Sequence, residues 1–291
     1  MVNQNNLILL EYRDSIKEQY EIERKFATKI KLAQKNSELR RNLLRQAYTE
    51  VSKIELTYPS HLTIDCGLGA YLVPVIMALP LSGKKVLEVG CGTGSLCVAL
   101  AKKGFVTTGL DLSPVRIEKA KERAKQSNQN TGNFMVCNFM EAPLPDTDFD
   151  VIINDNVLEH IPMDEASDFI LNCKAKLKSG GWLISITPNR LVGPYDVSGY
   201  FLPRGTAAQG LHLKEYTFAE LTTLLNRAEL GTLYSLPATA QIAARLGLIN
   251  SRRIWWYKST IMEKILRLVP GPLRIPKLFR VLVSDIIIAQ K

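Results

Sequence analysis

Residues 85–101, KVLEVGCGTGSLCVALA, constrain the fold of this chain more than any other stretch. The apolar start predicts a buried strand over 85–89, the glycines predict a tight turn over 90–94, and the rest predicts a helix from 95 onward. Glycines lack a Cβ, so the turn can adopt positive φ angles and a ligand can lie against its backbone, beside the unpaired N–H groups of a helix N-terminus. The stretch therefore predicts a strand-loop-helix site of the nucleotide-binding type.

Two classes of cofactor bind such a loop. The dinucleotide fingerprint G-x-G-x-x-G would require a third glycine where Ser95 stands, whereas this loop reads G-x-G-x-G and follows the acidic Glu88. A second apolar segment, 106–110, predicts a strand that ends in Asp111, about twenty residues beyond the loop, where a carboxylate can accept both hydroxyls of an adenosine ribose. The spacing disfavours a hydride-carrying dinucleotide.

Three segments carry a family resemblance: VLEVGCGTG, TGLDLSPVRIEKAKERA and FDVIINDNVLEHI. They resemble the first motif, the ribose-binding strand and helix, and the fourth-strand motif of the class I S-adenosylmethionine-dependent methyltransferases, and the resemblance covers about residues 84–291. It implies an α/β, Rossmann-like seven-stranded sheet with helices on both faces, and S-adenosylmethionine as the cofactor. The alternative is a dinucleotide-binding or structural Rossmann unit without methyl transfer.

The resemblance also implies a set of cofactor-binding residues. Asn138 stands where the family usually has an acid that accepts a hydrogen bond from the adenine amino group, and an amide oxygen can accept the same bond. Residues 154–157 read Asn-Asp-Asn-Val rather than the N-P-P-Y type of the adenine-amine methylases, which argues against base N-methylation. The expected cofactor-binding residues are Glu88, Gly90, Cys91, Gly92, Gly94, Asp111, Leu112, Asn138, Phe139, Asp155, Asn156 and Val157.

A second group of polar residues follows the predicted fourth strand. Asn156, Glu159 and His160 have the spacing i, i+3, i+4, so on a helical turn they would face one way and could share a cation. Some family members carry Glu-x-x-Glu-His there as a divalent-metal site, but here the first position is the neutral Asn156. Metal-free members carry Leu-Glu-His as a pair that caps the helix start and orients the loop. We expect no metal site.

The catalytic prediction starts from proton transfer. An alcohol or phenol must lose its proton as it accepts a methyl group, and a neutral imidazole has a suitable pKa. His212 lies on a long loop before the capping box Thr217-x-x-Glu220, so we expect His212, with Glu215, Tyr216 and His160, on the acceptor side. The alternatives are that His212 only hydrogen-bonds the loop, that His61 serves instead, or that positioning alone suffices.

The chain divides into an N-terminal helical extension, residues 1–60, and a methyltransferase domain, residues 61–291. Helical spacing of apolar residues between 11 and 53, interrupted near Asn36 or Ser37, predicts two amphipathic helices that serve as a lid, pack on the sheet or form a dimer contact. The uncharged run 66–83 contains Pro74 and Pro80, which favour a buried helix over a membrane span. Strands six and seven, 230–236 and 281–289, flank a cap insertion over about 237–278.

The charge and the cysteine content of the chain limit which partners and which cellular compartment suit it. The formal net charge is +9, and residues 251–291 contain nine Lys or Arg against two acids. This segment suits an acidic group, an anionic membrane surface or a solvated helix face. Five cysteines without C-x-x-C spacing fit a reducing cytoplasm.

These features predict a methyltransferase that acts by in-line displacement on a small molecule, with an oxygen of an apolar or amphiphilic metabolite as the favoured acceptor. The chain lacks a recognisable nucleic-acid module, which disfavours RNA ribose methylation as the alternative. A third hypothesis is a non-catalytic, cofactor-binding subunit that docks on a membrane. A homodimer and a peripheral membrane contact through the basic C-terminal region are the further expected partners.

Overall fold

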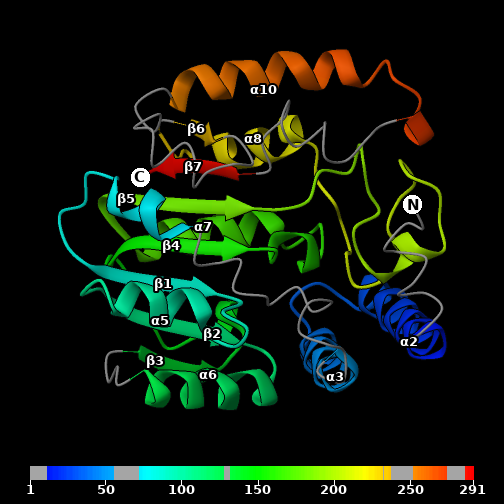
Figure 1. Ribbon diagram of the computed structural model, residues 1–291, viewed down its shortest axis with the longest axis horizontal. Coiled ribbons are helices and arrows are strands. Elements are labelled where there is room, and N and C mark those ends of the chain that lie inside the picture. The colour runs from blue at the N-terminus through cyan, green and yellow to red at the C-terminus, as the bar shows by residue number, and fades with distance from the viewer. Residues whose placement is uncertain (1–11, 56–71, 128–131, 232, 237–251, 274–285) are drawn as a thin grey trace.

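The computed structural model describes residues 12–55, 72–127, 132–231, 233–236, 252–273 and 286–291 (Figure 1). Its centre is one seven-stranded sheet with the order β3-β2-β1-β4-β5-β7-β6. The strands are β1 (Lys85–Val89), β2 (Val106–Asp111), β3 (Gly132–Val136), β4 (Phe149–Asp155), β5 (Leu177–Ile186), β6 (Leu233–Leu236) and β7 (Ile286–Gln290). Strand β7 runs antiparallel to both β5 and β6, and the other pairings are parallel.

Helices cover both faces of the sheet, so its strands are apolar on both sides. On one face, Leu87, Ile152 and Leu183 pack with α7 (Ala166–Lys176) and α8 (Phe218–Arg227). On the other face, the neighbouring residues Val86 and Val151 pack with α4 (Val73–Met77) and α5 (Ser95–Ala101). Helix α6 (Pro114–Gln126) packs beside α5 over Phe134. This is the α/β architecture that the sequence predicts, with helices on both faces.

The predicted element boundaries hold closely around the glycine loop. Strand β1, helix α5 and strand β2 match the expected ranges, and Ser113 Oγ accepts a hydrogen bond from the backbone N–H of Arg116 as the N-cap of α6. The pairing of β6 with β7 is confirmed, although β6 begins at Leu233 and the described residues 230 and 231 lie outside it. The capping box of Thr217 and Glu220 is also confirmed at the start of α8.

One boundary prediction is wrong. From the sequence alone, residues 164–177 predict a helix that Gly180 or Gly181 closes, but α7 ends at Lys176 and β5 begins at Leu177. Leu177 pairs with Phe149, and the register then shifts so that Trp182 pairs with Val151. Gly180 has a φ of 74° and lies inside this irregular strand, so the glycine marks a bulge rather than a helix end.

The N-terminal extension forms α2 (Arg13–Leu32) and α3 (Glu38–Glu55), with the predicted break at residues 33–37. Phe26 and Ile30 of α2 pack against Leu43 and Ala47 of α3, and Leu211 from the loop before α8 joins this cluster. Figure 1 shows both helices beyond the ends of the parallel strands to which the arrowheads point. The extension therefore lies at the sheet edge where open α/β folds bind ligands.

Ion pairs that are wholly or partly buried hold α3 against the predicted methyltransferase domain. The Arg40 guanidinium is buried and donates from Nη1 to Asp164 Oδ1 at 2.9 Å and to Glu165 Oε1 at 2.7 Å, while Nη2 bonds the carbonyl of Ala33. Glu55 near the end of α3 pairs with Arg116 of α6. Among the described residues, no helix combines the length and apolar character needed to cross a bilayer.

We expect Arg40→Met to lower the free energy of unfolding by about 3 kcal/mol, because it leaves the Glu165 carboxylate without its buried partner. Urea denaturation measures this. The matched control is Arg45→Met on the same helix, where the guanidinium is exposed and 3.9 Å from Glu141, so a change below about 0.5 kcal/mol is expected. Equal effects of the two substitutions would contradict a structural role for the Arg40 pair.

Candidate active site

The glycine loop adopts the backbone that its sequence predicts. Gly90, Gly92 and Gly94 have φ angles of 72°, 52° and 75°. A Cβ built on Gly90 would lie 2.4 Å from Cγ2 of Val157, so a larger residue would both strain the backbone and collide with the end of β4. The loop thus lies directly against the turn that follows β4.

Asp111 connects the loop to the end of β2. Its Oδ2 accepts a hydrogen bond from the backbone N–H of Gly92 at 3.0 Å, and its Oδ1 accepts one from the backbone N–H of Ser113 at 2.8 Å. Each carboxylate oxygen has a second lone pair, so both can still accept a ribose hydroxyl. The donor set fits the ribose of an adenosine cofactor.

Three other predicted cofactor-binding residues, Glu88, Cys91 and Leu112, lie in or near the glycine loop. Glu88 is buried and its Oε2 accepts a hydrogen bond from Sγ of Cys97 at 3.0 Å. The backbone N–H of Cys91 donates to the carbonyl of Leu110 at 2.8 Å, which ties the loop to β2. Leu112 packs against the cluster formed by α2 and α3. The segment that follows β2 beside the glycine loop therefore contacts the N-terminal extension.

The predicted adenine contacts lie at the end of β3. Asn138 Oδ1 accepts a hydrogen bond from the backbone N–H of Met140 and caps the short helix η2 (Phe139–Glu141). Its second lone pair can accept from an adenine amino group. Phe139 is buried, with its ring 5.3 Å from that of Phe169 in an edge-to-face contact, so it belongs to the core beneath the site.

The turn after β4 corrects one sequence-based grouping. Asn156 has a φ of 53°, and its Nδ2 donates to Asp155 Oδ1 at 3.0 Å, so its side chain points along the strand end. The helix η3 (Leu158–His160) begins only after it and is a 3₁₀ helix. Because i, i+3, i+4 neighbours require an α-helical turn that includes Asn156, grouping it with Glu159 and His160 was wrong.

His212 takes the place that Asn156 was expected to fill. One donor atom each from Glu159, His160 and His212 lies within 4.8 Å of the other two, and His212 Nε2 is 3.9 Å from Glu159 Oε1. The two imidazole rings meet edge to face with centroids 4.8 Å apart. We name these three residues the Glu-His-His cluster.

Hydrogen bonds fix the orientation of each member. His160 Nδ1 donates to the carbonyl of Leu211 at 3.0 Å, and His212 Nδ1 donates to Glu215 Oε1 at 2.8 Å, so both rings leave Nε2 for the cluster. Glu159 Oε2 accepts from the hydroxyl of Thr187 at 2.9 Å. Glu159 Oε1 is buried and has no hydrogen bond within the part of the chain that the structure describes.

The electrostatics of the cluster follow from its burial. Desolvation raises the pKa of Glu159 to about 7 and lowers the pKa of His160 well below its usual value. Burial alone would lower the pKa of His212, but the hydrogen bond to Glu215 and the charges of Glu159 and Glu215 raise it to about 9. At neutral pH, His160 is therefore neutral and His212 carries a proton on both ring nitrogens.

The donor set of the cluster fits a divalent cation. One carboxylate and two imidazoles are ordinary ligands once His212 has lost its Nε2 proton, and each imidazole has a carbonyl or carboxylate partner on its other nitrogen, which is the common arrangement behind metal-binding histidines. Glu159 Oε1, which is buried and accepts no hydrogen bond among the described residues, is also available to bind a cation. The expectation of no metal site rested partly on the neutral Asn156 and partly on the metal-free members that carry Leu-Glu-His, and only the first reason is removed when His212 completes the cluster.

The remaining acceptor-side predictions separate into two outcomes. Glu215 orients His212 and also accepts from the backbone N–H of Tyr195 at 2.7 Å. Tyr216 is buried in the core, and its hydroxyl has no hydrogen bond within the described residues, so the structure does not bring it to the cluster through any bond. His61 lies outside the described residues.

Two functional neighbours carried no sequence signal. The ring of Tyr48 from α3 packs edge to face on His160 with centroids 5.6 Å apart, and Thr187 bonds Glu159 from the end of β5. Both are far from the cluster in sequence, so only the tertiary fold reveals them.

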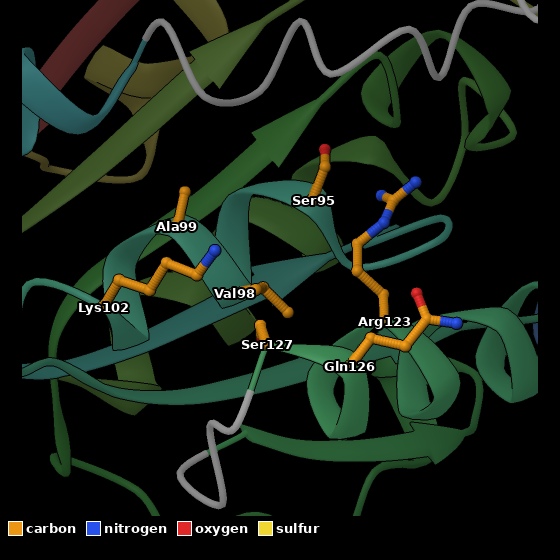
Figure 2. Close-up of a pocket in the computed structure, with 7 residues that line it drawn as sticks. All are labelled: Ser95, Val98, Ala99, Lys102, Arg123, Gln126 and Ser127. Atoms are coloured by element: carbon orange, nitrogen blue, oxygen red, sulfur yellow. The ribbon is translucent and has the colours of Figure 1, made fainter.

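A hollow of about 380 Å³ lies between α5 and α6 (Figure 2). Figure 2 shows Arg123 and Lys102 extending into the space between the two helices. The lining residues are Ser95, Val98, Ala99, Lys102, Arg123, Gln126 and Ser127. None of these residues belongs to the glycine loop or to the Glu-His-His cluster, although Ser95 directly follows Gly94 of the loop.

Comparison with known proteins agrees with this geometry. The family model described as "Methyltransferase domain" matches residues 86–181. A "Ubiquinone biosynthesis O-methyltransferase" of Coxiella burnetii is 40% identical over 150 residues, which cover 48% of this chain and 62% of that protein. A protein of the same name from Thiobacillus denitrificans is 34% identical over 160 residues, which cover 53% of this chain and 67% of the relative.

The solved structures show the same fold. A putative O-methyltransferase from Nostoc punctiforme superimposes with a TM-score of 0.51 at 18% identity, covering 79% of this chain and 66% of that one. The chain thus spans 62% of the length of the Coxiella relative and two thirds of the length of the Thiobacillus one. With the glycine loop, Asp111 and the strand order in agreement, the chain belongs to the class I S-adenosylmethionine-dependent methyltransferases.

Proposed function

We propose that this protein transfers the methyl group of S-adenosylmethionine to an oxygen of a small-molecule acceptor. The observation that carries the proposal is the contact between Gly90 and Val157, because it joins the cofactor loop to the turn that leads to Glu159 and His160. The cofactor site and a buried group of proton-accepting side chains are therefore two residues apart along the chain.

Different residues would bind different parts of the cofactor. The backbone of the glycine loop lets the cofactor approach the main chain, Asp111 accepts the ribose hydroxyls, and Asn138 accepts from the adenine amino group. S-adenosylmethionine, when bound, supplies an electrophilic sulfonium methyl group. We further propose that α2 and α3 act as a lid, because Leu112 beside the cofactor loop and His160 in the cluster both contact them.

The Glu-His-His cluster would act on the acceptor oxygen. Glu159 and His212 act as a pair. After this pair has lost one proton, it can accept the proton of the acceptor hydroxyl, while Glu215 holds the His212 imidazole in place. If a divalent cation occupies the cluster, Glu159, His160 and His212 would hold it, and it would supply a Lewis acid that favours the ionised acceptor.

The names of the relatives favour an acceptor of the ubiquinone-biosynthesis type, which is consistent with the apolar or amphiphilic acceptor that the sequence suggests. Tyr216 stays a candidate residue on the acceptor side by sequence position, and Asp155 and Asn156 stay candidate cofactor-binding residues at the strand end. The acceptor class is the part of this proposal that experiment should settle first.

The test is transfer of a labelled methyl group from S-adenosylmethionine into an extract of the source cells. We expect the label to enter the organic phase, where mass spectrometry identifies the product. A Gly92→Arg variant is the control, because Gly92 has a φ of 52°, which a residue with a side chain adopts only with strain, and its N–H bonds Asp111. Label in nuclease-sensitive material would contradict the proposal and favour RNA ribose methylation, and label at the level of the control would favour a non-catalytic subunit.

A further inference from the structure

Helix α10 (Arg252–Leu266) presents apolar side chains to solvent. It forms the outermost layer beyond β6 and α8, at the top of Figure 1. Ile261 and Ile265 are 55% and 50% exposed, and Leu268 in the turn that follows is 85% exposed. These residues are three and four positions apart, so they line one face, which we name the outer face of α10.

The opposite face of α10 is held against the domain by hydrogen bonds and by apolar packing. Glu263 is buried, and its carboxylate accepts hydrogen bonds from the backbone N–H groups of Phe218 at 2.7 Å and Ala219 at 2.9 Å. These are orphan donors of the first turn of α8, so Glu263 caps that helix from another element. Met262 and Leu266 pack against the core. The rotation of α10 about its axis is thereby fixed, with its exposed apolar residues directed outward.

The charges around the outer face have one sign. Among the described residues of this segment, Lys264 is exposed between Ile261 and Ile265, and Arg267 in the following turn is exposed and pairs with Glu263 at 3.5 Å. Because the Glu263 carboxylate points toward α8, it does not place an acidic group on the outer face. A second copy of the same face would bring like charges together, which disfavours self-association and favours an anionic surface.

We propose that the outer face of α10 docks on an anionic lipid bilayer, with Ile261, Ile265 and Leu268 entering the region between headgroups and acyl chains. A helix that carries aliphatic residues flanked by lysine and arginine lies in that interface when its axis is parallel to the surface. Each basic residue near an anionic leaflet adds attraction that salt weakens. The docking requires neither the cofactor nor the methyl acceptor, so it stands apart from the proposed reaction.

The test is co-sedimentation of the full chain with vesicles of phosphatidylcholine alone or mixed with phosphatidylglycerol. We expect binding to the mixed vesicles that falls with added salt, and a loss of at least about tenfold in affinity for the Ile261→Ser/Ile265→Ser/Leu268→Ser variant. Because all three side chains are exposed, this variant should unfold at the wild-type temperature.

The matched control is Leu39→Ser/Met163→Ser, which removes two exposed apolar residues, 62% and 69% exposed, from another part of the surface and should bind as the wild type does. Equal binding of the control and of the α10 variant would overturn the proposal, and so would equal binding to the two kinds of vesicle. Light scattering without vesicles is the final check, because a wild-type dimer that the α10 variant converts to a monomer would make the outer face a self-interface.

Discussion

Replacing Glu159 by alanine is expected to lower kcat/KM for methyl transfer about a thousandfold, as removal of a proton-accepting or cation-binding group does. Glu159 is buried between two imidazoles, and its Oε1 is the one carboxylate oxygen of the cluster that faces His212 at 3.9 Å. The Kd for S-adenosylhomocysteine should stay within about threefold, because no cofactor-binding prediction involves this residue. Isothermal titration and initial rates measure the two effects separately.

The pH dependence of the wild-type rate follows from the same group. A proton acceptor works when it is unprotonated, so kcat/KM should rise with pH as Glu159, with a pKa raised to about 7, and His212, with a pKa raised to about 9, lose their protons. The residual rate of Glu159→Ala should not rise in the same way. A rate that is flat from pH 6 to 9 in the wild type would contradict the assignment.

Chelation separates the two roles of the cluster. If a cation is held there, EDTA should lower the wild-type rate at least about tenfold, and Mg²⁺ or Mn²⁺ should restore it, whereas a purely proton-accepting cluster keeps its rate. Thr187→Val removes the hydroxyl bonded to Glu159 Oε2 and should cost about tenfold. The exposed Glu229→Ala is the control, and a loss of rate there would show that the effects are not specific to the cluster.

The sequence predicts the strand, the glycine loop and the helix around residues 85–111 well because their geometry is decided locally. Gly90 and Glu88 lie in one continuous stretch, and Asp111 follows at the distance that one helix and one strand require. The positive φ angles follow from the glycines themselves. Where spacing and backbone chemistry decide the geometry, a single sequence is sufficient.

The acceptor half could be predicted only in part. His212 and Glu215 were found because the capping box after them places their loop, but their partner Glu159 was grouped with Asn156 through an assumed α-helical turn. The 3₁₀ geometry after a residue with φ of 53° has no distinct sequence pattern. Contacts such as Tyr48 on His160 join residues more than one hundred positions apart, so hydrophobic periodicity could not reveal them.

Glu23 is the other residue that only the fold identifies. It is buried in α2, where Oε2 accepts from the backbone N–H of Leu211 at 3.0 Å and Oε1 accepts from Gln19 Nε2 at 2.6 Å. The carbonyl of Leu211 in turn accepts from His160 Nδ1. The backbone of Leu211 is thus hydrogen-bonded on both sides, by the N-terminal extension through its N–H and by the cluster through its carbonyl.

The environment of Glu23 determines its titration. Burial raises the pKa from 4.5 to about 7, the hydrogen bonds from Leu211 and Gln19 oppose that rise, and the charges of Asp196 and Glu55 add to it. The folded state therefore binds a proton at Glu23 more tightly than the unfolded state does. Its contribution to stability is fully present below pH 4.5 and is lost as the pH rises through about 7.

Glu23→Gln should remove this loss, because glutamine does not ionise and its amide oxygen can still accept from the Leu211 N–H. We expect the variant to be more stable than the wild type by about 3 kcal/mol at pH 8 and nearly equal to it at pH 4.5. Urea denaturation across this range measures the difference. Glu21→Gln, exposed on the same helix, should show no pH-dependent gain. A variant less stable than the wild type at pH 8 would mean that Glu23 is ionised and well paired in the folded protein, and that α2 is fastened to the cluster by a charge rather than by a neutral hydrogen bond.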